Sequence, residues 1–104
     1  MDDDSYDAFK DRIIELAGSL SELYRRALVE YTPVVESIIR SKSRDIRHIE
    51  QTLDHLLDFS CDDEVLLLFK KLCRYYYTIN PVSTAEYVLA YRDMWDSDEP
   101  DDKP

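Results

Sequence analysis

Two histidines offer the most obvious place to look for a metal site. His48 and His55 lie seven residues apart, and Asp45 and Asp58 lie three residues outside them. On a helix, seven residues rise about 10 Å, whereas a shared zinc ion sits about 2 Å from each ligand, so one ion cannot bind both imidazoles. Both histidines also project away from the apolar face of their segment. We therefore predict solvated histidines, with no metal and no other cofactor.

The main concentration of positive charge lies at Arg40, Arg44 and Arg47. Steps of four and three residues place these side chains on one face of a helix, where they could hold a phosphate or another anion. The ordinary alternative is a solvated helix on which Glu36 pairs with Arg40 and Glu50 offsets Arg47. Readers of nucleic acid usually carry a strongly basic patch, so we expect no nucleic-acid partner. A nucleic-acid-associated regulator that uses this face is kept as an alternative.

Catalytic motifs are absent from the sequence. A single glycine in 104 residues leaves no Gly-rich phosphate loop, and neither H-E-x-x-H nor a nucleophile motif occurs. We predict no catalytic residues and therefore no enzyme. An enzyme whose residues converge from separate helices stays a further alternative.

The composition favours helices and places the charge at the two ends of the chain. One glycine and four prolines are too few for the turns of a strand-rich fold. The net charge is -10, yet residues 8–92 hold thirteen acids and twelve bases and are nearly neutral. Flexible acidic ends keep a protein soluble and repel other polyanions, so the charge does not predict a nucleic-acid mimic.

The two cysteines and the absence of a long apolar run predict where the protein works. Cys61 and Cys73 fit no disulfide framework, zinc ribbon or redox pair, which indicates a reducing compartment. No leader pattern and no 18-residue apolar stretch is present in the sequence. We expect a cytoplasmic protein that makes no membrane contact.

Apolar residues recur at steps of three and four through the first segment. They are Tyr6, Phe9, Ile13, Leu16, Leu20, Tyr24, Ala27, Leu28 and Tyr31. This spacing predicts one continuous amphipathic helix over about residues 5–31. Thr32 and Pro33 then have the form of a helix start, because threonine caps free amides and proline suits the first helical position.

Three more helices are predicted after this point. The second begins at Pro33 and either bends or breaks at the polar residues 41–43. The third follows an acidic cap at residues 60–64 and ends near residue 77. The fourth covers about residues 83–96 and begins with a capping box made by Ser83 and Glu86. The fold is thus an all-α, up-and-down bundle of four helices, or five if the second breaks, in one domain over residues 1–96, with a disordered acidic tail at residues 97–104.

The third helix has the widest apolar face, which predicts that it is the most buried. Its outward side is expected to hold Leu67, Lys70, Lys71 and Arg74. Tyr76 and Cys73 are predicted to be core residues, whereas Tyr77 and Tyr87 are left open between core and rim.

The predicted helix lengths do not match one another. The first two helices, at about 26 residues each, would be about 39 Å long, whereas the third and fourth would reach only about 25 Å and 20 Å. The turn at Thr32 would then stay uncovered. The residues left bare would be Tyr24, Leu28, Tyr31, Val34, Val35, Ile38 and Ile39. In the five-helix alternative, residues 33–40 fold back over the core as a short separate helix.

An apolar patch of this size predicts an interface. We expect a non-enzymatic helical protein–protein interaction module that acts as a homodimer or as a subunit, inhibitor or adaptor. The expected partner is another protein or a second copy of the chain.

Overall fold

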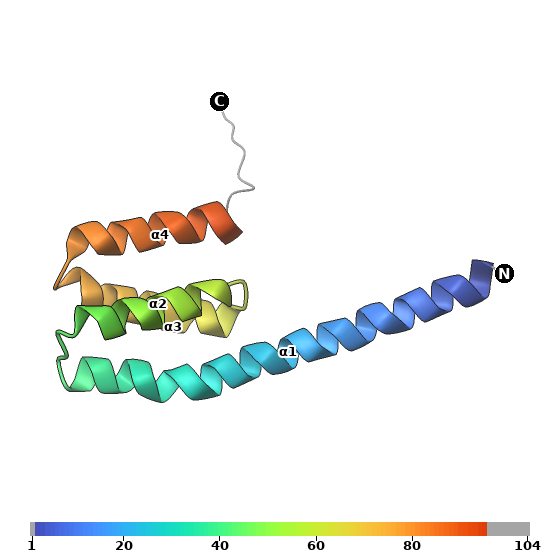
Figure 1. The fold of residues 1–104 in the computed structure, drawn as a ribbon, viewed down its shortest axis with the longest axis horizontal. Coiled ribbons are helices and arrows are strands. Elements are labelled where there is room, and N and C mark those ends of the chain that lie inside the picture. The colour runs from blue at the N-terminus through green and yellow to red at the C-terminus, as the bar shows by residue number, and fades with distance from the viewer. Residues whose placement is uncertain (1, 96–104) are drawn as a thin grey trace, which may run out of the picture.

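The computed structural model describes residues 2–95, with side chains from residue 5 onward. Its helices are α1 (Asp2–Arg40), α2 (Ile46–Asp58), α3 (Asp63–Tyr77) and α4 (Pro81–Trp95). No strand occurs within this described part of the chain. Successive helices run antiparallel (Figure 1), so the prediction of an all-α bundle of four helices is confirmed. The predicted tail at residues 97–104 lies outside the described residues.

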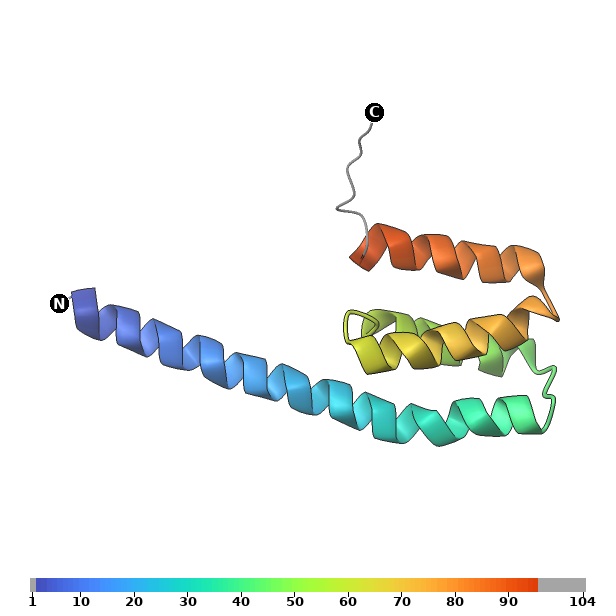
Figure 2. The same cartoon turned by 180° about the vertical axis from the view of Figure 1, so that it is seen from behind.

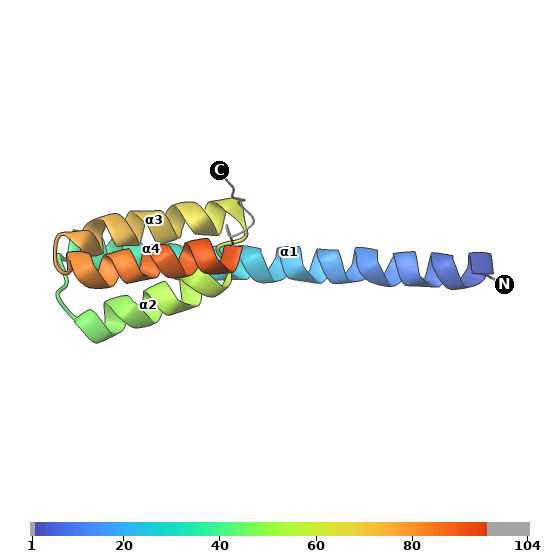
Figure 3. The ribbon, with the colours of Figure 1, turned by 90° about the horizontal axis from the view of Figure 1, so that it is seen from above.

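The helices form three layers. α2 and α3 lie side by side in the middle layer, with α1 on one side of the pair and α4 on the other (Figure 1; Figure 3, seen from above). α3 contacts all three other helices. The prediction that the third helix is the most buried is therefore confirmed. None of the four helices combines the length and apolar content needed to cross a membrane.

α1 is far longer than the helices that pack against it. Its 39 residues rise about 58 Å, and its N-terminal half projects beyond the ends of α2, α3 and α4 (Figure 2). The radius of gyration is 17.7 Å, whereas a compact domain of this size has about 13 Å. The molecule is thus a small bundle with a projecting helical arm.

The predicted helix start at Thr32 and Pro33 is wrong, because α1 continues through both residues. Proline has no N–H to donate to the carbonyl one turn back, on Val29, and Val29 lies on the solvent side, 69% exposed. The Thr32 hydroxyl donates to the Leu28 carbonyl at 2.6 Å and adds a local bond beside the gap. Residues 33–40 belong to α1, so the five-helix alternative is wrong too.

The break predicted as one possibility at residues 41–43 is confirmed. Lys42 has a φ of 53°, in the left-handed region that ends a helix, and the Ser43 amide donates to the Ile38 carbonyl at 3.0 Å. The Asp45 carboxylate then accepts from the His48 amide at 3.2 Å and caps α2.

The starts of α3 and α4 differ in how well the sequence predicts them. Asp62 caps α3 by accepting from the Glu64 and Val65 amides, each at 3.1 Å, inside the predicted acidic cap. The capping box at Ser83 is wrong. Asn80 caps α4 instead, accepting from the Ser83 amide at 3.1 Å, and Pro81 takes the first helical position.

One core lies among α1, α2 and α3. Its members are Val35, Ile38, Ile49, Leu53, Leu56, Val65, Leu68, Phe69, Leu72, Cys73 and Tyr76. The core positions predicted for Tyr76 and Cys73 are confirmed, and the four residues predicted to face outward from the third helix are exposed. Tyr77 is exposed, whereas Tyr87 is partly buried against the core.

A substitution of Val35 tests this assignment of the core. Val35 is 0% exposed, so Val35→Asp buries an unpaired charge and should lower the free energy of unfolding by at least about 3 kcal/mol. Val29→Asp places the same charge on the exposed side of the same helix and should have little effect. Urea denaturation followed by circular dichroism measures both. A stable, folded Val35→Asp monomer would contradict the core position.

Candidate functional site

A row of exposed apolar side chains lies on the projecting part of α1. We call residues 5–23 the arm, and we call its six apolar side chains at steps of three and four the arm seam. The seam consists of Tyr6, Phe9, Ile13, Leu16, Leu20 and Leu23, which are 61%, 61%, 48%, 57%, 39% and 44% exposed. The first five belong to the stripe found in the sequence, and Leu23 was missed, although it continues the same spacing.

The arm seam is the uncovered half of a stripe that is buried farther along α1. At 100° per residue, Ala27, Val35 and Ile38 point in the same direction as the seam, and they are 5%, 0% and 2% exposed. α2 and α3 cover these three residues and stop before the arm begins (Figure 1). One face of α1 is therefore buried in its C-terminal half and exposed to solvent in its N-terminal half.

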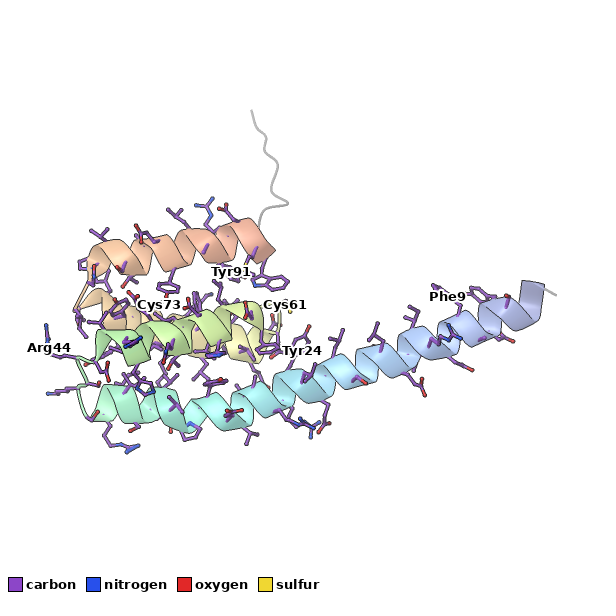
Figure 4. The ribbon with its side chains drawn as sticks, viewed as in Figure 1. Phe9, Tyr24, Arg44, Cys61, Cys73 and Tyr91 are labelled. Carbon is purple, nitrogen blue, oxygen red and sulfur yellow. The ribbon has the colours of Figure 1, made fainter. Side chains whose placement is uncertain are left out.

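Tyr24 marks the point where the bundle stops covering α1. Its ring meets the Phe59 ring edge-on, with centroids 6.2 Å apart, and the Cys61 thiol lies 3.2 Å from its hydroxyl. The hydrogen bond with Cys61, and to a lesser degree burial, raises the pKa of Tyr24. Figure 4 shows Tyr24 beside Cys61, with Phe9 far out on the arm.

The seven residues predicted to form an interface do not form a bare patch. Val35 and Ile38 lie inside the core, and Leu28, Tyr31, Val34 and Ile39 pack against it. The expectation of a bare turn at Thr32 is wrong because the chain turns at residues 41–45, which places residues 24–40 level with α2 and α3. Their use as a partner interface stays a prediction, but most exposed apolar side chains of α1 lie elsewhere, on the arm.

The predicted basic face does not lie on one helix. Arg40 ends α1, Arg44 lies in the following loop, where Figure 4 shows it pointing outward, and Arg47 lies in α2. All three are exposed. The expected pairing of Glu36 with Arg40 is also replaced, since Glu36 lies 3.9 Å from Lys71 of α3.

The two histidines are exposed on α2, as predicted. The His55 ring stacks on Tyr31, with centroids 5.6 Å apart, and its Nδ1 lies 2.8 Å from the Gln51 carbonyl oxygen. Among the described residues, no group of three or more histidine, cysteine or acidic side chains is placed to hold a metal ion.

A groove between α3 and α4 is the second candidate site. It has a volume of about 410 Å³, within the range of small-molecule pockets. Its lining is mainly apolar, with two cations at the rim: Leu66, Phe69, Lys70, Cys73, Arg74, Tyr77, Thr84, Val88 and Tyr91. Burial raises the pKa of the Cys73 thiol to about 12, so this thiol stays protonated and is a poor nucleophile.

Tyrosine hydroxyls of α3 and α4 bind carboxylates of α2. Tyr76 donates to the Glu50 carboxylate at 2.5 Å, and Tyr87 donates to the Asp54 carboxylate at 2.8 Å. Burial first, and then these carboxylates, raise the pKa of both phenols. These groups hold the bundle together and are not free to bind a partner.

No protein-family model matches the chain, and neither a curated protein nor a solved structure is similar enough to match it.

Thiol labelling tests the placement of the cysteines. Cys61 is exposed, whereas Cys73 is buried with a pKa raised to about 12. We expect Ellman's reagent to modify one thiol rapidly in the native protein at pH 8 and both thiols in guanidinium chloride. Cys61→Ser should remove the fast phase. Two fast thiols in the native protein would show that the groove wall around Cys73 is open.

Proposed function

We propose that the protein is a non-enzymatic interaction module that binds another helix along the arm seam. The observation that supports this proposal is the row of six exposed apolar side chains on the only part of α1 that its own bundle leaves uncovered. Soluble proteins rarely leave a contiguous apolar surface of this kind without a partner.

The shape of the arm indicates the kind of partner. A narrow apolar stripe along a single helix is buried most completely by a second helix lying beside it or by a hydrophobic groove. Tyr6 and Leu23, at the two ends of the seam, are 17 positions apart, which is about 26 Å along the axis. A flat partner surface would leave the two sides of so narrow a stripe exposed to solvent.

The free cysteines bear on where this binding takes place. Cys61 and Cys73 do not pair with each other, and one of them is exposed. An exposed thiol persists best in a reducing compartment, so we place the function in the cytoplasm.

Charged substitutions in the seam test the proposal. Leu16→Asp combined with Leu20→Asp should weaken complexes formed by the native chain at least tenfold, because each places a charge where the partner must be dry. The matched control is Ile14→Asp, since Ile14 is 61% exposed on the same arm but lies off the seam. Affinity capture at moderate salt, with the mass of each complex, compares the three proteins. Equal recovery with the seam variant would contradict the function.

The bundle provides an internal control for this experiment. The core cluster contains no residue of the arm. The seam variant should therefore keep the urea midpoint of the unaltered protein, so lost binding cannot be attributed to unfolding.

Gly18 gives a second test that leaves the seam intact. It lies within α1, and a Cβ added there meets nothing within 4 Å. Gly18→Ala should stabilise the arm helix by about 1 kcal/mol and tighten binding several-fold, because less order remains to be gained on association. Gly18→Pro should break the arm and weaken binding. Binding curves for the two variants that move in the same direction would show that the arm helix is not the binding element.

A further inference from the structure

The arm seam has the spacing that lets a helix pair with a copy of itself. Tyr6, Ile13 and Leu20 recur every seven residues, and Phe9, Leu16 and Leu23 recur in the same way three residues later. These are the two apolar positions of a heptad repeat. Gly18 falls at the outermost position of the heptad, where the structure leaves open space around it.

We infer that the occupant of the arm seam is the arm of a second copy of this chain, lying antiparallel to the first. This inference rests on the proposed function and names the partner. Leu23 of the second copy lies opposite Tyr6, Leu20 opposite Phe9, and Leu16 opposite Ile13. Symmetry repeats each pair, so the two arms form six apolar layers.

This register covers the seam completely. Sliding the second arm by one heptad in one direction leaves Leu20 and Leu23 without an apolar residue opposite them. Sliding it in the other direction brings Glu30 opposite Tyr6. Of these three registers, the one that places Tyr6 opposite Leu23 pairs all six seam residues with one another.

The position of the bundle opposes the parallel arrangement. In a parallel pair in register, residues from Ala27 onward of both copies would meet on the face where α2 and α3 already cover Ala27, Val35 and Ile38. Figure 2 shows α2, α3 and α4 all on one side of α1, over its C-terminal part. In the antiparallel pair, the arm of each copy, residues 5–23, reaches only to the level of Tyr24, where the bundle of the other copy begins to cover α1.

Site-specific crosslinking tests both the partner and the direction. In a background of Cys61→Ser and Cys73→Ala, with folding checked by circular dichroism, we would prepare two single-cysteine variants, Tyr6→Cys and Leu23→Cys. A short bismaleimide should join the two variants when they are mixed. It should leave each variant alone largely uncrosslinked, because like positions in an antiparallel pair are about 26 Å apart. Mass spectrometry separates the mixed product from the two homodimers.

Sedimentation of the full native chain across a range of concentrations completes the test. A monomer–dimer equilibrium that Leu16→Asp with Leu20→Asp shifts at least tenfold toward monomer, and that Ile14→Asp leaves unchanged, is the expected result. Preferred crosslinking of each variant with itself would overturn the antiparallel direction. A chain that stays monomeric would overturn the second copy as the occupant, and seam-dependent capture of a different protein would then leave the proposed function standing. Association that the combined Leu16→Asp and Leu20→Asp variant leaves unchanged would overturn both the second copy as the occupant of the seam and the proposed function.

Discussion

A helix of 39 residues rises about 58 Å, whereas α2, α3 and α4, with 13 to 15 residues, reach only about 20–23 Å. Because the three short helices run back and forth over the same part of α1, they leave its first half uncovered (Figure 1). The last part of α1 supplies Val35 and Ile38 to the core, and the first part is left with an apolar stripe and nothing of its own to bury it. The three layers, the single core and the bare arm all follow from this difference in length.

The sequence contains two possible ends for α1. Thr32 with Pro33 and the polar run at residues 41–43 both have the chemistry of a helix boundary, and only the second is used. If the helix ended at Thr32, Val35 and Ile38 would no longer lie on the same helical face as Ala27. Continuing through Pro33 forfeits one backbone hydrogen bond on the solvent side but keeps all three residues on one buried face. Tertiary packing therefore decided between two local signals of similar strength.

Properties that depend on local periodicity were predictable, and those that depend on where the chain turns were not. The burial of Tyr76 and Cys73 and the exposure of Lys70 and Arg74 follow from the phase of one short helix, and the structure confirms them. The basic face required Arg40, Arg44 and Arg47 to share one helix, which the loop at residues 41–45 prevents. An exposed apolar surface was expected because the predicted helices differ in length, and the structure has such a surface. Because the turn was predicted at Thr32 and lies at residues 41–45, the expected surface was placed near the C-terminal end of the apolar stripe, whereas the exposed part is the N-terminal end.

The arm is also the part of the molecule that the bundle stabilises least. Residues 5–23 contribute nothing to the core cluster, and Gly18 weakens their helix by about 1 kcal/mol relative to alanine. A lone helix of such length is only marginally stable in water, because most helical stability in proteins comes from packing an apolar face. Covering the arm seam supplies that packing. Under the proposed function, binding and ordering of the arm would be one equilibrium, in which the bundle stays folded while the arm alone responds to the concentration of the binding partner.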